Sequence, residues 1–214
     1  IKSSNLCTEI VEFSDKKETA VCNLASIALP SFVNRETRKF DYDKLHAVSQ
    51  VVTENLNNII DLNFYPTDKT VTSNAKHRPI GIGVQGLADA FVLMDIPFHS
   101  EEAKKINTQI FETMYHGALT RSNEMAIQCR HNMVPVADNA VLESTAGAYC
   151  SFKGSPLSVG QFQFDMWNVV PSDRYDWSAL RASIVEFGTR NSLLMAPMPT
   201  ASTSQIMGFN ECFE

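Results

Sequence analysis

The sequence has no run of apolar residues near the roughly eighteen that a membrane-spanning helix requires. It also lacks any cluster of lysine and arginine, since 18 basic residues face 24 acidic ones and the net charge is -6. A nucleic-acid surface needs the opposite balance. We therefore expect neither a membrane protein nor direct nucleic-acid binding. The first residues lead into no apolar stretch, so we also expect no signal peptide.

The five cysteines lack the spacing of a metal site. They lie at positions 7, 22, 129, 150 and 212 without a CxxC or CxxH pair, so we expect no metal. The sequence also contains no Asn-x-Ser/Thr glycosylation site. An odd number of thiols is typical of a reducing compartment, where a disulfide is transient and catalytic. These features predict a cytoplasmic protein.

The bulk composition is that of an ordinary globular protein. With 214 residues, of which 44% are hydrophobic and 20% charged, the chain can bury a full core. The sequence begins without Met and stops without a tail-like composition. We expect residues 1–214 to be a single segment of a larger protein.

Hydrophobic periodicity predicts helices and strands in alternation. Apolar residues recur at 3–4 residue spacing over 42–62, where Asp41 is available as N-cap. Ser100 and two glutamates begin a second long helix of roughly eight turns. The remaining patterns predict strands over 8–13, 79–86 and 190–197, helices over 87–94 and 177–187, and loops over 66–74 and 129–163. This alternation predicts a parallel α/β fold.

The first twenty-two residues carry the most chemistry. In an extended backbone, residues at i, i+2 and i+4 point to one face, about 6.5–7 Å apart. Asn5, Cys7 and Glu9 would then present an amide, a thiol and a carboxyl together, and Cys22 follows in an apolar run. Such groups can hold hydroxyls, accept a proton and perform nucleophilic, redox or radical chemistry. From spacing alone, a surface strand with one buried cysteine is the simpler explanation.

Gly81, Gly83 and Gly86 form a literal GxGxxG. With Glu101 near the position of a ribose-binding acid, one alternative is a dinucleotide-dependent oxidoreductase. That fingerprint requires a full apolar strand before its first glycine, whereas residues 74–79 are mostly polar. The preferred interpretation is a short buried strand whose glycines permit close packing, followed by a helix.

A second functional stretch follows the strand predicted over 190–197. It is a small-residue turn leading into a helix start, composed of Pro199, Thr200, Ala201, Ser202 and Thr203. Free backbone N–H groups and the positive end of a helix dipole suit a bound anion. An ordinary Ser/Thr helix cap explains the local pattern as well.

Several motifs, in this order, resemble one family. They are Asn-Leu-Cys-Thr-Glu at 5–9, Ala-Val-Cys-Asn-Leu-Ala-Ser at 20–26, Arg-Pro-Ile-Gly-Ile-Gly-Val-Gln-Gly-Leu-Ala-Asp-Ala at 78–90, Asp-Met-Trp-Asn at 165–168 and Ala-Pro-Met-Pro-Thr-Ala-Ser-Thr at 196–203. Over nearly its whole length the chain is similar to the large, catalytic subunit of class I ribonucleotide reductase, of the eukaryotic and viral type. The similarity is weakest at 14–19, 34–41 and between the cysteines at 129 and 150.

The resemblance implies a ten-stranded α/β barrel of two five-stranded halves, to which this chain supplies the central finger loop and much of the second half. It implies that Cys7 becomes a thiyl radical and abstracts the 3′-hydrogen of a ribonucleoside diphosphate. Glu9 would take the 3′-hydroxyl proton, and Asn5 would hydrogen-bond the ribose hydroxyls. Cys22 would be half of the redox pair that supplies electrons as the 2′-hydroxyl leaves. Residues 199–203 would hold the substrate diphosphate.

The family's other requirements lie outside this segment, and the segment itself is expected to bind no cofactor. The family needs a small radical-generating diiron subunit, a thioredoxin- or glutaredoxin-type reductant, and ATP or dNTP effectors. The N-terminal ATP cone, the partner of Cys22 and the C-terminal parts are absent, so the segment alone should not turn over substrate. The remaining large-subunit segments and a second large subunit are expected partners. A non-catalytic scaffold is the other alternative, which the presence of all four N-terminal site residues disfavours.

Overall fold

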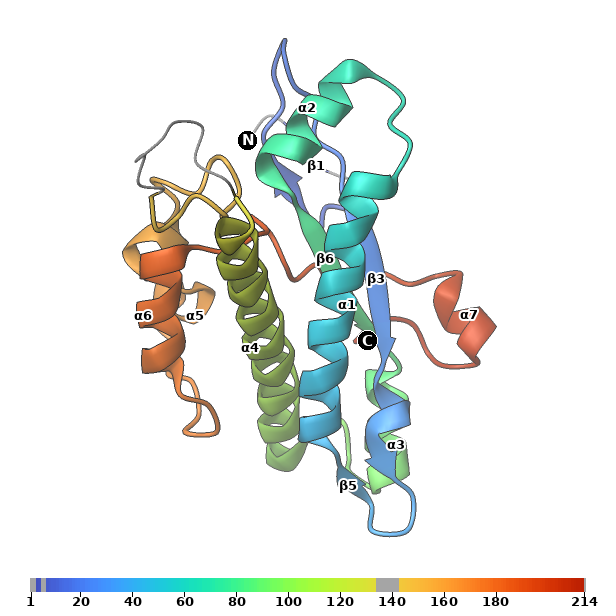
Figure 1. Cartoon of the computed structure of the whole chain (residues 1–214). Coiled ribbons are helices and arrows are strands. Elements are labelled where there is room, and N and C mark those ends of the chain that lie inside the picture. The colour runs from blue at the N-terminus through green and yellow to red at the C-terminus, as the bar shows by residue number, and fades with distance from the viewer. Residues whose placement is uncertain (1–2, 5–6, 134–142, 214) are drawn as a thin grey trace.

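The computed structural model describes residues 3–4, 7–133 and 143–213, and two parallel strands lie at its centre (Figure 1). Strands β3 (Asn23–Ala28) and β6 (Ile80–Gln85) pair along their whole length. Residues 193–196 follow the other side of β6 through a parallel bridge between Ile82 and Met195. The amide of Ala196 donates to the Ile82 carbonyl at 3.0 Å. The predicted α/β arrangement with parallel strands is confirmed, although only part of 190–197 is strand-like.

Strand β6 is buried at every position because its glycines admit close neighbours. A Cβ at Gly81 would lie 2.5 Å from Leu24 Cδ2, and one at Gly83 would lie 2.7 Å from Met198 Sδ. Gly86 has a φ of 75° and begins α3 (Leu87–Met94). The predicted close-packed strand and following helix are confirmed. Since Gly81 and Gly83 lie inside a strand rather than in a turn after it, the phosphate-binding turn of a dinucleotide fold is not formed.

The two long helices begin where the sequence predicts. Helix α1 (Tyr42–Leu62) is capped by Asp41, whose side chain accepts from Lys44 N. Helix α4 (Glu101–His131) is capped by Ser100, which accepts from Ala103 N. Each cap satisfies an N–H group that the first helical turn leaves unpaired. The two helices lie side by side, and α1 packs against β3 and β6 (Figure 1).

Small residues let α1 and α4 approach closely. A Cβ at Gly117 of α4 would lie 2.8 Å from the His46 carbonyl oxygen of α1. On α1 the fully buried positions include Ser49 and Thr53, whose hydroxyls bond back to carbonyls four residues earlier. Of the apolar residues that give α1 its helical period, Leu45 and Leu56 are buried, whereas Ile59 is 41% exposed. The buried face of α1 therefore combines apolar residues with small polar ones.

A histidine pair joins the same two helices. His46 Nε2 and His116 Nδ1 lie 2.8 Å apart, and the Tyr175 ring stacks on both imidazoles. Gln50 Nε2, a donor, lies 3.0 Å from His46 Nδ1, so His46 carries its proton on Nε2 and donates to His116. Burial and the neighbouring His46 lower the pKa of His116 to about 4. The pair is therefore neutral at pH 7.

The other elements surround this core. The loop predicted over 66–74 is wrong: a Thr67–Thr70 capping box begins helix α2 (Asp68–His77) there. Helix α6 (Trp177–Phe187) is confirmed at its predicted bounds. The shorter elements are β1 (Ser3–Ser4), β2 (Val11–Glu12), η1 (Leu29–Phe32), β4 (Val33–Asn34), β5 (Lys39–Phe40), η2 (Pro156–Val159), α5 (Gln163–Met166) and α7 (Thr203–Met207).

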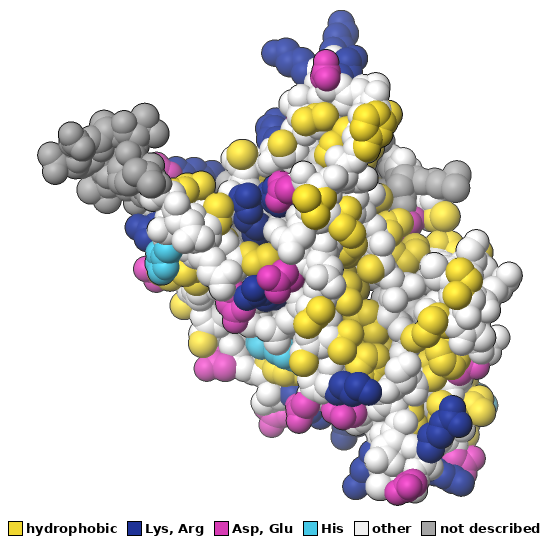
Figure 2. Space-filling model, turned by 45° about the vertical axis from the view of Figure 1, so that its right-hand side comes forward, with side chains coloured by type: hydrophobic (Ala, Val, Ile, Leu, Met, Phe, Trp, Pro, Cys, Tyr) yellow, Lys and Arg dark blue, Asp and Glu magenta, His cyan; other side chains and the backbone are white. Residues whose placement is uncertain are grey.

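The surface retains apolar side chains on the side where α7 lies. Figure 2 turns this side forward and shows hydrophobic groups over much of it. Ile206 and Met207 of α7 are 82% and 52% exposed, and Leu24 of β3 is 40% exposed. Among the described residues, β3 pairs with β6 alone and so has one open edge. None of the helices in the described ranges has the length and apolar character needed to cross a membrane.

Candidate active site

The Cys7 region is a hairpin turn rather than an extended strand. Strands β1 and β2 pair antiparallel, with Ser4 opposite Val11. Between them, residues 7–9 form a turn in which Thr8 has a φ of 66°. The prediction that 5–9 continue one extended strand is therefore wrong for Cys7 and Glu9, because a left-handed residue between them breaks the alternation. Asn5 lies outside the described residues.

The turn exposes the Cys7 thiol and partly encloses the Glu9 carboxyl. Cys7 is exposed, as expected for a group at the tip of a hairpin. Glu9 is half-buried, and its Oε2 atom is enclosed without a hydrogen-bond partner among the described residues. This oxygen can accept a hydrogen bond from a hydroxyl that binds beside it.

Cys22 lies immediately before β3, on the side of the sheet that the hairpin covers. It is half-buried and forms no disulfide. Burial, followed by the charges of Glu12 and Glu9, raises the pKa of the Cys22 thiol to about 11. The structure thus brings Glu9 and Cys22 into one electrostatic environment, although they are thirteen residues apart in the sequence. Cys22 is a protonated thiol at neutral pH.

Glu12 is a third member of this environment that sequence reasoning missed. Its Oε1 atom is enclosed, with no hydrogen-bond partner among the residues that the structure describes. Burial raises the pKa of its carboxyl to about 7. The sequence could have indicated this position, because residues two apart on a strand share a face and Glu12 is two residues after the apolar Ile10, which is buried. The candidate site therefore contains two carboxyl groups beside one thiol.

The predicted phosphate segment forms a loop at the other end of β3. Thr200 is buried with a φ of 58°, and its hydroxyl accepts from the Cys212 amide at 2.9 Å. Its side chain therefore holds the loop. Ser202 and Thr203 are exposed at the start of α7, as are Pro199 and Ala201. Ser202 makes no side-chain cap hydrogen bond, so its hydroxyl is available to a ligand.

The loop returns to the sheet through a second contact. Asn210 donates through its backbone amide to Asp89 Oδ2 at 2.7 Å and through its side chain to Asp89 Oδ1 at 2.9 Å. The Gly86 amide donates to the Asn210 carbonyl at 2.9 Å. The segment after α7 is thus fixed to the beginning of α3 through Asn210 and to Thr200 through Cys212. The Ser202 and Thr203 side chains remain exposed.

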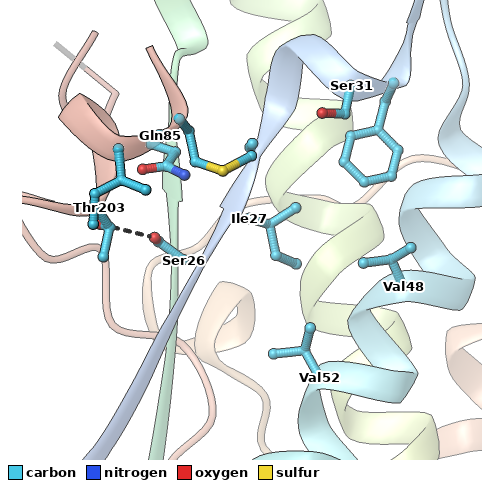
Figure 3. A pocket seen from close by; sticks show the side chains of 11 residues that line it. Ser26, Ile27, Ser31, Val48, Val52, Gln85 and Thr203 are labelled. Carbon is cyan, nitrogen blue, oxygen red and sulfur yellow. Dashed lines mark hydrogen bonds between the residues drawn. The ribbon is translucent and has the colours of Figure 1, made fainter. Parts of the chain in front are cut away.

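A pocket of about 450 Å³ lies beside this loop. Figure 3 shows Ser26 of β3 and Thr203 of α7 on one side and Val48 and Val52 of α1 on the other. The Ser26 and Thr203 hydroxyls lie 3.4 Å apart. Gln85 contributes a buried Oε1 that accepts no hydrogen bond from the described residues. Since no lysine or arginine lines the pocket within the described ranges, an anion here would be held by hydroxyls and backbone amides.

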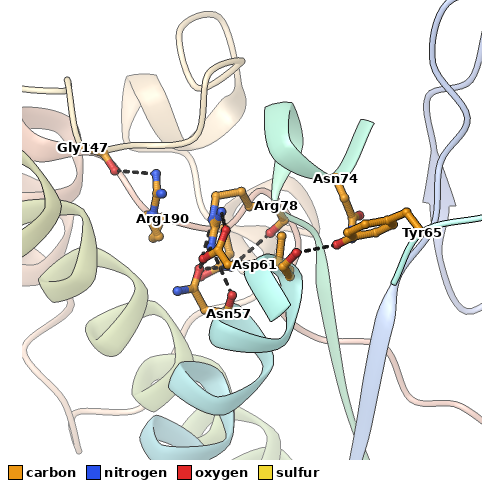
Figure 4. A network of polar contacts seen from close by, with 9 residues as sticks. Asn57, Asp61, Tyr65, Asn74, Arg78, Gly147 and Arg190 are labelled. Carbon is orange, nitrogen blue, oxygen red and sulfur yellow. Dashed lines mark hydrogen bonds and ion pairs between the residues drawn. The ribbon is translucent and has the colours of Figure 1, made fainter. Parts of the chain in front are cut away.

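A buried polar network fastens the strands beneath the site (Figure 4). Arg78, 4% exposed, donates to both oxygens of Asp61 at 2.7 Å and to Asn57 Oδ1 at 3.0 and 3.2 Å. Asn191 joins the same Asn57 oxygen at 3.2 Å and the Arg78 carbonyl at 3.0 Å. Its own Oδ1 accepts from Ser122 at 2.9 Å. The network links α1, α4, the start of β6 and the strand-like segment that leads to the phosphate loop.

The remaining cysteines and the acidic residues form no metal centre in the described ranges. No group of three or more His, Cys, Asp or Glu side chains there is arranged to hold a metal ion. Cys129 lies in the last turn of α4 and Cys150 in the loop after residue 143.

Comparison with known proteins agrees with these features. The family described as "Ribonucleotide reductase, barrel domain" matches residues 1–214. The ribonucleoside-diphosphate reductase large chain of Neurospora crassa is 55% identical over 214 residues, which is all of this chain and 21% of the relative. The large subunits of Arabidopsis thaliana and Danio rerio are each 53% identical over the whole chain, which corresponds to 26% and 25% of their lengths.

The chain thus spans about a quarter of the length of the curated relatives it matches. The match nevertheless includes the hairpin turn, both strands of the central pair and the loop at residues 199–203. The resemblance carried by the sequence motifs is confirmed, and the dinucleotide alternative is not supported. Because the family match extends over every residue, this chain belongs to the ribonucleotide reductase barrel-domain family.

Proposed function

We propose that this chain is the part of a ribonucleoside-diphosphate reductase that carries the radical cysteine and the substrate-phosphate loop. The reaction is the reduction of ribonucleoside diphosphates to 2′-deoxyribonucleoside diphosphates. The observation that carries the proposal is the family match over all 214 residues, which include an exposed Cys7, a half-buried Glu9 and Cys22 grouped around one hairpin. A scaffold would have no use for this grouping.

Cys7 is the proposed site of the thiyl radical that removes the 3′-hydrogen of the ribose. S–H and ribose C–H bonds are of comparable strength, so the transfer is reversible, and a closed site protects the radical from side reactions. Glu9, two residues further on in the same turn, is the proposed acceptor of the 3′-hydroxyl proton. Asn5 is the proposed partner of the ribose hydroxyls.

Cys22 is the proposed member of the redox pair. Two electrons pass to the substrate as the 2′-hydroxyl leaves as water, and the Cys22 thiol and a second thiol join in a disulfide. The second cysteine, and the thioredoxin- or glutaredoxin-type reductant that restores both thiols, lie outside this chain. The pKa of Cys22, about 11, favours a thiol that brings its hydrogen into the reaction.

Residues 199–203 are the proposed diphosphate site. A rise of about 3.3 Å per residue puts Ser26 about 13 Å beyond Cys22 along β3. The loop lies at that end of the strand, since Thr203 contacts Ser26. This separation is on the scale of a ribose with an extended diphosphate. The substrate would therefore lie along β3, with its sugar near the hairpin and its phosphates at the exposed Ser202 and Thr203.

The proposal also specifies what surrounds the segment. The parallel strands would form much of one half of a ten-stranded barrel, and the hairpin would be the finger loop at its centre. The open edge of β3 and the exposed apolar groups near α7 would be covered by other parts of the large subunit. A radical-generating diiron subunit, a second large subunit and nucleotide effectors would complete the enzyme.

The test uses a reconstituted full-length enzyme with reductant. In Cys22→Ser, Cys7 can still begin the reaction while the normal reducing electrons are missing, so we expect substrate-dependent loss of the radical with little or no deoxynucleotide. Cys150→Ser, which alters an exposed cysteine to which the proposal assigns no role, is the matched control and should retain activity. Normal deoxynucleotide formation by Cys22→Ser would refute its role.

A further inference from the structure

Strand β2 turns a carboxyl inward and apolar groups outward. Ile10 is 4% exposed, and Glu12 lies on the same face of the strand. The alternate residues Val11 and Phe13 are 47% and 49% exposed. Hydrophobic burial alone would favour a strand with Val11 and Phe13 facing inward and Glu12 facing solvent, since an enclosed carboxyl without a hydrogen-bond partner costs free energy. Folding stability therefore does not explain a glutamate at this position, which suggests that it has a functional role.

The inward face of the hairpin lies against the beginning of β3. The Ile10 side chain and that of Leu24 both reach the space above Gly81, where a Cβ would lie 3.0 Å from Ile10 Cδ1 and 2.5 Å from Leu24 Cδ2. Glu12 is two residues after Ile10 on that face, and Cys22 is two residues before Leu24. The Glu12 carboxyl and the segment that contains the Cys22 thiol therefore share this side of the hairpin, where the Glu12 charge acts on the thiol.

Charge couples the two groups. Besides burial, the charges that act on the Cys22 thiol come from Glu12 and then Glu9. A carboxylate and a thiolate in one poorly solvated environment repel each other, so the two groups titrate as a coupled set. A thiolate at Cys22 is therefore most favourable when a neighbouring carboxyl has taken up a proton. Glu12, whose pKa lies near 7, is best matched to do so at physiological pH.

We infer that Glu12 is a positioning residue for the proposed reduction, whose enclosed carboxylate keeps Cys22 in its thiol form until the thiol reacts. The inference rests on the proposed function of Cys22 as a redox cysteine. Its consequence is that Cys22 retains its hydrogen between turnovers and resists electrophiles and oxidants, which react with thiolates. Neutralising Glu12 removes its share of this protection and leaves that of burial and of Glu9.

The experiment measures the alkylation rate of Cys22 between pH 6 and pH 10 in the reduced full-length reductase. Iodoacetamide is the probe, and the Cys22 peptide is quantified by mass spectrometry. In Glu12→Gln we expect the pH profile to move down by about one unit, which makes Cys22 react about tenfold faster at pH 8. Glu12→Asp, which keeps the charge, should resemble the wild type. Glu36→Gln, in the exposed turn between β4 and β5, is the matched control.

Two results would overturn the inference. One is an unchanged Cys22 profile in Glu12→Gln while the exposed Cys150 reacts as in the wild type, which shows that the variant is folded. The other needs no variant: a wild-type Cys22 profile that coincides with that of a free cysteine, whose pKa is about 8.5. Turnover is measured in parallel. If the wild-type enzyme forms deoxynucleotide and the Cys22 profile of Glu12→Gln is unshifted, the inference alone is refuted. If the profile is shifted but the reconstituted wild-type enzyme forms no deoxynucleotide, the proposed function alone is refuted.

Discussion

Removal of the Asn57 side chain should loosen the strands beneath the site far more than its size suggests. Asn57 Oδ1 accepts from Arg78 Nε at 3.2 Å, from Arg78 Nη2 at 3.0 Å and from Asn191 Nδ2 at 3.2 Å. In Asn57→Ala all three are lost. Arg78 Nη2 keeps its bonds to Asp61 and to the Asn57 carbonyl, but Nε has no other acceptor among the described residues. A buried donor of a charged group is then left unpaired.

The expected cost is about 3 kcal/mol, since a hydrogen bond to a charged group contributes about 1.5–3 kcal/mol and an unsatisfied buried donor adds its desolvation. Hydrogen exchange measures this cost locally, in peptides from the end of α1, from β6 and from residues 189–195. At 1.4 kcal/mol for each factor of ten, exchange there should accelerate by roughly a hundredfold.

The matched control is Asp61→Asn. Asp61 also bonds Arg78 at two positions, but its side chain is 60% exposed, so water can replace it. We expect a smaller cost than in Asn57→Ala, because asparagine keeps an acceptor for Arg78 and water can reach the exposed position. If Asn57→Ala accelerates exchange no more than Asp61→Asn does, the network is not what holds these strands.

Three further predictions concern the site and the helix pair. Glu9→Gln keeps the size of the side chain but removes the base, so turnover should fall by roughly 10²–10⁴ in a steady-state assay; an unchanged rate would exclude Glu9 as the base. The double variant Ser202→Ala/Thr203→Ala should weaken diphosphate substrate binding by about 1.5–3 kcal/mol for each hydrogen bond lost, and equal affinity in a binding titration would refute the loop assignment. The depressed pKa of His116, about 4, means that the unfolded chain binds more protons below its own value near 6.5. Stability should therefore fall as the pH drops from 6.5 toward 4, and this slope should be smaller in His116→Gln by thermal unfolding.

The long helices could be predicted from the sequence because their signals are local. Asp41 and Ser100 each precede an amphipathic period, and both cap the helices that they predict. Helix α2 was missed because its residues are polar and its capping box uses Thr70 in place of the usual glutamate or glutamine. On α1 the apolar period correctly predicted the buried Leu45 and Leu56, but not the buried Ser49, which lies beside Gly117 of α4.

The site was predicted by motif more than by geometry. Spacing placed Cys7 and Glu9 on one extended strand, but the left-handed Thr8 turns the chain between them. Such a turn is difficult to foresee, because threonine rarely adopts a positive φ. Glu12 escaped notice because a single glutamate in an alternating stretch is usually a solvated residue. Only its position over the start of β3 distinguishes it, and that position depends on contacts distant in sequence.

The most direct test of the central claim is deoxynucleotide formation by Cys7→Ser in the reconstituted full-length enzyme with its radical-generating subunit and reductant. An O–H bond is too strong for a tyrosyl-derived radical to oxidise, so the serine variant should form no deoxynucleotide even though it binds substrate normally. Binding is measured in parallel to show that the site is intact. Deoxynucleotide formation at the wild-type rate by Cys7→Ser would contradict the assignment of the radical to this hairpin.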